Sequence, residues 1–256
     1  MSSFDREKFL IPIAHRGLHD ERQGRIENTA PSFLAAIQHG FGIECDIRPA
    51  ALSRPVVFHD PTTERLLDET RTVADLTQDD LARLRYRDGK SAILTFDEFL
   101  QLVEGRVPLL VEIKSEWSAP DAVFLKEVIR LIRAYSGPLA LMSFDPAILS
   151  FVRALEPTIP RGMIAAATGP EDPLARIVGA ERASDLSNLL ESGPPAPDCY
   201  AYRVCDLPTP VTRYAREIHG RPFFAWTVRS PEDFRTAARW ADAPIFEGLL
   251  PPERMP

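Results

Sequence analysis

Short apolar runs rich in β-branched residues alternate with longer helical patterns along almost the whole chain. This alternation is typical of an α/β protein, in which helices connect the strands of a mostly parallel sheet. At 256 residues the chain has about the usual size of one (β/α)8 TIM barrel, and we predict a single domain of that fold over residues 1–256. The runs expected to form strands are 11–15, 42–47, 55–59, 107–114, 139–144, 162–166, 199–204, 223–228 and 244–248.

Nine candidate strands for eight barrel places mean that one of them lies outside the barrel, and the sequence does not say which. The clearest helical patterns between them cover residues 27–40, 118–137 and 231–241. Residues 61–106 are less regular and contain two helical pieces, "TQDDLARL" and "TFDEFLQLV". We interpret this segment as a small insertion, or cap, between the third and fourth strands.

Charge, cysteine content and apolar runs indicate which partners and which cellular compartment suit this chain. The net charge is −7, from 30 basic and 37 acidic residues, and this disfavours a nucleic-acid partner. Three cysteines without metal or redox spacing suit a reducing compartment. The N-terminus lacks the apolar core of a signal peptide, and no run approaches the roughly 18 apolar residues of a membrane span. We expect a cytoplasmic protein without stable membrane insertion.

Two candidate strands carry charged residues two positions apart. Residues at that spacing share one face of a strand, so Glu44 and Asp46 point the same way, as do Glu112 and Lys114. Two neighbouring carboxylates repel each other and cost desolvation, which a hard cation relieves. Taken singly, each pair also has an ordinary explanation: carboxylates beyond the strand in solvent, or a Glu–Lys pair that satisfies itself.

Further residues that can carry charge stand at the ends of the first and third candidate strands, namely His15 with Arg16, and His59. A lone histidine is more often structural, and Asp60 before a proline suits a turn. The C-terminal ends of parallel barrel strands, however, converge on one face, where barrel enzymes hold their sites. Three carboxylates suit Mg²⁺ or Ca²⁺, two histidines make an acid and a base, and Arg16 and Lys114 can bind an anion. Together these groups predict phosphoryl transfer.

The motifs "AHRG", "IENT", "IECDI", "VVFHD", "LLVEIK" and "AWTV", in this order and spacing, resemble the glycerophosphodiester phosphodiesterase family. That family consists of TIM-barrel relatives of the phosphatidylinositol-specific phospholipases C. The resemblance runs from His15 to about Ser230, most of the chain. It implies metal-dependent hydrolysis of a small glycerophosphodiester to glycerol 3-phosphate and an alcohol, with one divalent cation, Mg²⁺ or Ca²⁺, as the cofactor.

The resemblance also implies a role for each matched residue. Glu27 is expected beside the metal or one layer of residues behind it. The implied set is Glu44, Asp46 and Glu112 as metal ligands, His15 and His59 as the acid–base pair, Arg16 and Lys114 as phosphate contacts, Trp226 as an apolar wall near the glycerol, and Glu27 and Asn28 as supporting residues.

The chain departs from the family pattern in two places. The usual Asp-Gly turn before "VVFHD" is replaced by "ALSRP", which changes a turn and leaves the matched residues intact. The C-terminal "GIITD" pattern is replaced by "APIFEGLLPPE", where Glu247 stands in only partly for the aspartate. The sequence therefore does not identify the residues that form the last wall of the substrate pocket.

Other functions stay open at this stage. One alternative is a lysophospholipase D-like enzyme or another phospholipid phosphodiesterase of the same superfamily. A second is a barrel that binds its ligand without catalysis, against which the retention of every matched residue argues. A glycosidase using Glu44 and Glu112 would leave both histidines and Lys114 without roles. The sequence leaves open which histidine is the acid and whether water or a neighbouring hydroxyl attacks.

Overall fold

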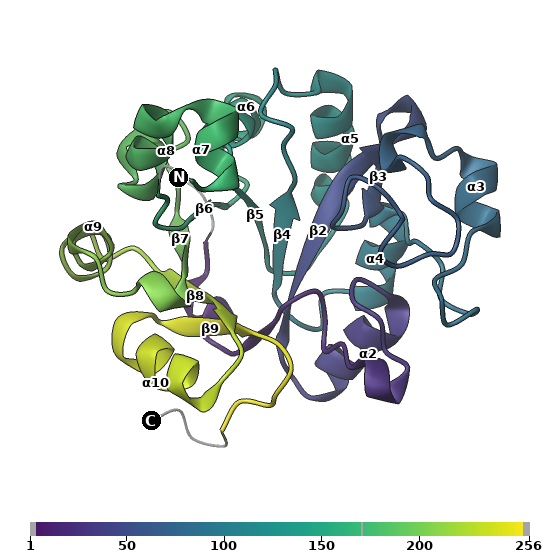
Figure 1. Ribbon diagram of the computed structural model, residues 1–256, viewed down its shortest axis with the longest axis horizontal. Coiled ribbons are helices and arrows are strands. Elements are labelled where there is room, and N and C mark those ends of the chain that lie inside the picture. The colour runs from purple at the N-terminus through teal and green to yellow at the C-terminus, as the bar shows by residue number, and fades with distance from the viewer. Residues whose placement is uncertain (1–3, 170, 253–256) are drawn as a thin grey trace. The chain divides into compact units, whose positions relative to one another are not determined.

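The strands and helices of the chain follow one another in (β/α)8 order in the computed structural model, which describes residues 4–169 and 171–252 (Figure 1). The fold is a TIM barrel, as the sequence predicts. The chain divides into two compact units, which we describe one at a time. The N-terminal unit comprises residues 14–114 and 121–139, and the C-terminal unit takes the rest of the described chain.

The N-terminal unit contains three strands, β2 (Gly42–Ala50), β3 (Arg54–Val57) and β4 (Leu109–Ile113). Strands β2 and β4 run parallel, and their register places Asp46 opposite Glu112. Strand β3 runs antiparallel to β2, with Val57 opposite Ile47. It is therefore the strand that does not belong among the eight parallel ones, and all nine predicted strands exist.

The prediction that His59 stands at the C-terminal end of a parallel barrel strand is wrong, because β3 is antiparallel. Strand β2 continues four residues past Asp46, turns at Ala51–Ser53, and the chain returns as β3. The Phe58 amide donates to the Asp46 carbonyl at 3.0 Å, so His59 reaches the level of Asp46 on the returning arm of a hairpin. His59 thus lies beside Asp46 as expected, but it reaches this position from an antiparallel strand.

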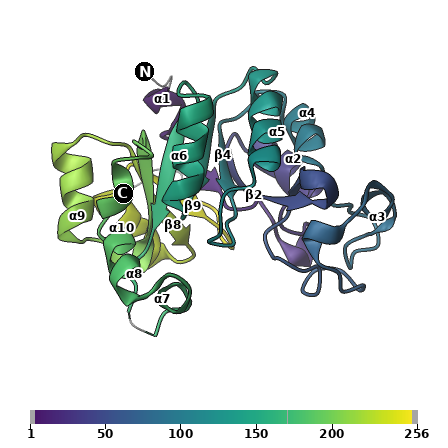
Figure 2. The same ribbon diagram turned by 90° about the horizontal axis from the view of Figure 1, so that it is seen from above.

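The helices of the N-terminal unit cover its strands. Helices α2 (Ala30–Gln38), α4 (Phe96–Val103) and α5 (Ala122–Arg133) contact β2 and β3 and follow the predicted helical patterns (Figures 1 and 2). Thr29 precedes α2 as its N-cap, and a proline stands in the first turn. None of the helices in the described part of the chain combines the length and apolar character that crossing a bilayer requires.

The segment between β3 and β4 packs against β2 and β3 through one apolar cluster. It contains helix α3 (Gln78–Arg83), which lies at the outer edge of the N-terminal unit in Figures 1 and 2. Phe58 and Tyr86 are almost fully buried and their rings lie 6.0 Å apart. The same cluster includes Val56, Leu67 and Ile93. The apolar side chains thus attach this segment to β3, close to His59.

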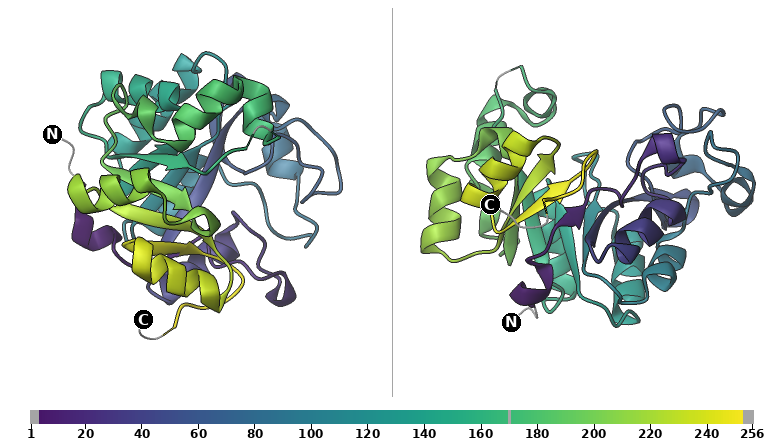
Figure 3. Two further views of the ribbon diagram at one scale, coloured as in Figure 1. Left: turned by 60° about the vertical axis from the view of Figure 1, so that its left-hand side comes forward. Right: turned by 90° about the horizontal axis from the view of Figure 1, so that it is seen from below.

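The C-terminal unit repeats a strand and helix alternation. Its strands β5 to β9 pair in parallel where they fall within this unit, and α10 packs on β8 and β9, as Figure 3 shows. Strand β1 (Ile13–Ala14) lies where the units adjoin in the sequence. The remaining elements are α1 (Arg6–Phe9), β5 (Leu139–Ser143), α6 (Pro146–Leu155), β6 (Arg161–Ala165), α7 (Pro173–Val178), α8 (Ala180–Ser187), β7 (Cys199–Arg203), α9 (Pro210–Arg213), β8 (Phe223–Val228), α10 (Pro231–Trp240) and β9 (Ala243–Phe246).

Candidate active site

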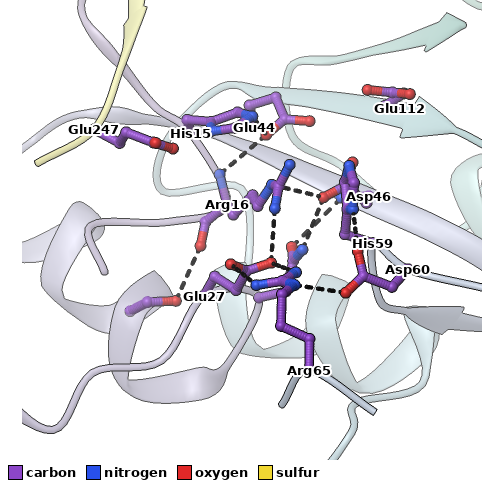
Figure 4. A network of polar contacts seen from close by, with 12 residues as sticks. His15, Arg16, Glu27, Glu44, Asp46, His59, Asp60, Arg65, Glu112 and Glu247 are labelled. Atoms are coloured by element: carbon purple, nitrogen blue, oxygen red, sulfur yellow. Dashed lines mark hydrogen bonds and ion pairs between the residues drawn. The ribbon is translucent and has the colours of Figure 1, made fainter. Parts of the chain in front are cut away.

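Three carboxylates from β2 and β4 form a buried acidic cluster in the N-terminal unit (Figure 4). Glu44, Asp46 and Glu112 each offer an oxygen atom, and these atoms lie within 4.8 Å of one another. Their exposed fractions are 3%, 0% and 8%. The period-two alternation of β2 and the parallel register with β4 bring them together. The chain therefore gathers the three acids that the sequence analysis proposed as metal ligands.

The acids of the cluster do not hold their negative charge equally. Burial, reinforced by the charges of Asp46 and Glu112, raises the pKa of Glu44 well above its ordinary value. Burial also raises the pKa of Glu112, in spite of Lys114 nearby. For Asp46 burial acts in the same direction, but the cations around it, Lys114 first, bring its pKa far below the usual range. Asp46 is therefore the permanent anion, and full ionisation of the other two needs more positive charge.

Lys114 and Arg16 supply part of that positive charge. Lys114 Nζ lies 2.8 Å from Asp46 Oδ1 and 2.7 Å from Glu112 Oε1. The Arg16 backbone amide donates to Glu44 Oε2 at 3.0 Å, and Arg16 Nε lies 3.4 Å from Asp46 Oδ2. Two cations therefore face three carboxylates. The donor set of three buried carboxylates, without a thiolate, fits a hard divalent cation such as Mg²⁺ or Ca²⁺.

Replacing Glu44 with glutamine should stabilise the metal-free protein. Because the folded state raises the pKa of Glu44, ionising this carboxyl above its ordinary value of 4.5 opposes folding. The amide removes that cost, and its oxygen can still accept from the Arg16 amide. With chelator at pH 7 we expect a Tm increase of about 2–4 °C, equivalent to about 1 kcal/mol. The gain should shrink as the pH falls toward 4.5, and a lower Tm for E44Q at pH 7 would contradict it.

The loop that follows β1 also contacts the Asp46 carboxylate, through Asn28. Arg16 and Asn28 both adopt left-handed backbone conformations, with φ of 55° and 54°. The Asn28 amide donates to the Arg16 carbonyl at 2.9 Å, which ties the two ends of the loop together. Asn28 is 1% exposed, and its Nδ2 donates to Asp46 Oδ2 at 2.8 Å. The asparagine of the "IENT" motif therefore fixes the orientation of the Asp46 carboxylate.

Gly17 of the "HRG" motif occupies a place where no side chain fits. Its φ is 79°, and a Cβ atom there would lie 2.5 Å from Ser32 Oγ and 2.9 Å from Phe33 Cδ1. Gly24 in the same loop has a similar φ of 69°, but nothing lies within 4 Å of its Cβ position. Glycine at position 17 thus lets the loop pass close to the start of α2 while Arg16 faces the acids.

The substitution Gly17→Ala should destabilise the protein by about 2–5 kcal/mol. The left-handed conformation costs about 1–2 kcal/mol for a residue with Cβ, and the overlap with Ser32 and Phe33 adds the remainder. Gly24→Ala carries only the conformational cost and is the matched control. Urea unfolding of both variants measures the difference, and equal free energies of unfolding would show that the close approach at position 17 is unimportant.

The two histidines have different surroundings. His15 Nε2 lies 3.9 Å from Glu44 Oε2. His59 lies beside Asp46 in Figure 4, and its Nδ1 is 2.6 Å from Asp60 Oδ1. Burial, together with the charges of Lys114 and Arg16, lowers the pKa of His59 to about 4, although Asp46 acts in the opposite direction. His59 is therefore a neutral imidazole at neutral pH.

Arg65 is a site residue that the sequence analysis missed. Its Nε donates to Asp60 Oδ2 at 2.6 Å, and its two terminal nitrogens donate to both oxygens of Glu27 at 2.8 and 2.7 Å. Glu27 Oε1 also accepts from Arg16 Nη1 at 2.8 Å. Glu27 thus lies between two guanidinium groups, behind the acidic cluster. No periodic pattern marks Arg65, which stands in the irregular segment after His59.

The predicted apolar wall residue Trp226 belongs to the C-terminal unit, on β8. Its ring contacts that of Phe144 edge to face, with centroids 5.4 Å apart and planes at 88°. In the same unit, Glu247 accepts from Arg229 Nε at 2.6 Å. The role of Trp226 near a glycerol group stays a prediction.

The sequence matches the glycerophosphoryl diester phosphodiesterase family over residues 15–246. The chain belongs to this family. It is thus a phosphodiesterase by family, as the motifs in the sequence predict. A comparison with curated proteins finds no match.

Solved structures of similar fold include proteins that bear the same family name. A Silicibacter pomeroyi protein assigned as a glycerophosphoryl diester phosphodiesterase has a TM-score of 0.75 and 21% identity, over 95% of this chain and 94% of that one. The Thermotoga maritima glycerophosphodiester phosphodiesterase has a TM-score of 0.68 and 22% sequence identity, over 93% of both chains. An Oleispira antarctica phosphodiesterase was solved with the product sn-glycerol-3-phosphate. It has a TM-score of 0.71 and 21% sequence identity, over 93% of this chain and 92% of that one. At these identities the likeness shows the fold.

Proposed function

We propose that the protein hydrolyses small glycerophosphodiesters to sn-glycerol 3-phosphate and an alcohol in a reaction that requires a divalent cation. Family membership supports the phosphodiesterase chemistry, and the product bound by the Oleispira antarctica relative supports the glycerol phosphate half. The observation that carries the proposal is the cluster of three buried carboxylates with Lys114 and Arg16 beside it. This arrangement suits a cation and a phosphate anion at one place.

Glu44, Asp46 and Glu112 would hold the cation, Mg²⁺ or Ca²⁺. When bound, it supplies positive charge that polarises a phosphoryl oxygen. It would also neutralise the carboxyl groups whose pKa values burial raises.

Arg16 and Lys114 bind the phosphate and stabilise the charge that develops on its oxygens. The buried Arg16 Nε forms an ion pair with Asp46 Oδ2 at 3.4 Å but makes no hydrogen bond to the residues that the structure describes, which leaves a donor for a phosphate oxygen. Arg16 Nη1 is held by Glu27, so the guanidinium has a fixed direction. Asn28 keeps the Asp46 carboxylate in place through its side-chain amide.

The two histidines divide the proton transfers between them. A carboxylate accepts but does not donate, so Asp60 keeps the His59 proton on Nδ1 and leaves Nε2 free to accept one. His59 is therefore the proposed base, which deprotonates the attacking water or neighbouring glycerol hydroxyl. His15 is the proposed acid, which protonates the departing alcohol. Trp226 would provide an apolar surface for the glycerol group.

The test is a hydrolysis assay with Mg²⁺ or Ca²⁺ over a panel of diesters that includes glycerophosphocholine, glycerophosphoethanolamine and a lysophospholipid. We expect release of glycerol 3-phosphate from the soluble diesters. Faster turnover of the lysophospholipid would favour the phospholipid-cleaving alternative. Absence of phosphodiester hydrolysis with either metal would contradict the proposal and favour a barrel that binds without catalysis.

A further inference from the structure

We propose that Arg65 is a positioning residue that fixes the catalytic imidazole of His59 and the phosphate-binding guanidinium of Arg16 at the same time. The proposal rests on the function proposed above and assigns a role to a residue outside the acidic cluster. Arg65 reaches both groups through one carboxylate each, Asp60 on one side and Glu27 on the other (Figure 4).

The first arm of this arrangement runs from Arg65 through Asp60 to His59. Arg65 Nε donates to Asp60 Oδ2 at 2.6 Å, and Asp60 Oδ1 lies 2.6 Å from His59 Nδ1. With one oxygen held by Arg65, the carboxylate cannot rotate away from the imidazole. Because the other oxygen only accepts, it selects the tautomer with the proton on Nδ1. Arg65 therefore determines which ring nitrogen of His59 is free to react.

The second arm runs from Arg65 through Glu27 to Arg16. The planar Arg65 guanidinium donates to both Glu27 oxygens, at 2.8 and 2.7 Å, a paired geometry that a lysine cannot reproduce. Glu27 Oε1 also accepts from Arg16 Nη1 at 2.8 Å. The Glu27 side chain is 12% exposed, whereas that of Arg65 is 45% exposed. Arg65 is thus the solvent-facing member of this pair, and Glu27 is the buried one.

Arg83 provides a matched control in the same segment of the chain. Its side chain is 55% exposed and it also bridges two carboxylates, Glu69 at 2.7 Å and Asp80 at 3.2 Å. The hydrogen bonds of Arg83 end on Glu69 and Asp80, away from His59 and Arg16. Exposed ion pairs contribute little to stability. Loss of either arginine should therefore leave the protein folded, and only the loss of Arg65 should disturb the reaction.

The kinetic test compares Arg65→Met, Arg65→Lys and Arg83→Met with the wild type on glycerophosphocholine. Loss of a residue that orients reacting groups typically costs on the order of 10- to 100-fold in activity. We expect R65M to lose that much in kcat, R65K to recover part of it, and R83M to stay within about twofold. R65M as active as R83M would overturn the proposal. Full activity of R65K would also overturn it, because charge without the paired geometry would then suffice.

The second test uses ¹⁵N NMR of the imidazole nitrogens and needs no turnover. The chain has 5 histidines, so the His59 signals can be assigned by comparison with H59A. In the metal-free wild type and R83M we expect His59 with its proton on Nδ1. In R65M we expect a mixture of both tautomers, and an unchanged tautomer would overturn the proposal. If the wild type hydrolyses no diester, the proposed function fails, and this spectrum still tests what Arg65 does to His59.

Discussion

His59→Ala should lower kcat by about 10²–10⁴-fold while the protein stays folded, the range expected when a positioned acid or base is removed. The Asp60 carboxylate directs the His59 proton to Nδ1, and burial lowers the pKa of His59 to about 4, so at neutral pH its other nitrogen can accept a proton. His15→Ala should produce a loss of the same order. Steady-state kinetics on glycerophosphocholine measures both effects.

His219→Ala is the control for this experiment. His219 lies in the C-terminal unit, where its ring packs 4.9 Å from that of Tyr214, and it matches none of the family motifs. We expect its kcat to stay within about twofold of the wild type, and circular dichroism should show the same fold in all three variants. Rates close to wild type in both H15A and H59A would exclude the histidine pair as the acid and base.

Chelation of divalent ions should abolish hydrolysis, and Mg²⁺ or Ca²⁺ should restore it. The same ion should raise the Tm of the chelated protein, because a ligand at 100 times its Kd adds about 2.7 kcal/mol to the stability of the folded state. Cation binding needs ionised carboxylates, and the pKa values of Glu44 and Glu112 are raised. The Tm increase should therefore diminish as the pH falls, since protons compete with the cation.

Asp46→Asn tests whether the cluster is the place where the ion acts. This variant should stay inactive when the metal is restored, and its Tm should not respond to the metal. Asp79→Asn, an exposed carboxylate of α3 outside the cluster, is the control and should behave as the wild type. Full activity in the presence of chelator would exclude a cation requirement, and a normal metal response of D46N would exclude Asp46 as a ligand.

The sequence predicts the strands of this fold and the acids of the site for a common reason. A strand has a fixed period of two, so Glu44 and Asp46 share a face whatever surrounds them. The parallel register then adds Glu112 directly opposite Asp46. The sequence does not predict which strands run parallel in the barrel. The short run at 244–248 is a parallel strand, whereas the stronger run at 55–59 is antiparallel to its neighbour.

The direction of β3 depends on a turn that composition does not reveal. Leu52 and Ser53 adopt φ of 60° and 56°, a left-handed conformation that side chains disfavour. Hairpin turns of this kind usually contain glycine or asparagine, and neither residue stands here to indicate the turn in the sequence. Arg65 escaped the sequence analysis for a related reason. It stands in an irregular segment where neither helical nor strand periodicity applies, and its contacts with Asp60 and Glu27 arise only when the apolar side chains of that segment pack against β3.

The division of the chain into two units bears on how relatives of this protein can diverge. The ionisable groups that we propose to hold the cation, bind the phosphate and transfer protons all stand between His15 and Lys114. Mutations accumulating after Leu139 therefore leave these groups themselves intact. Sequence change that keeps the C-terminal unit folded is consequently compatible with retention of the chemistry encoded in the first half of the gene.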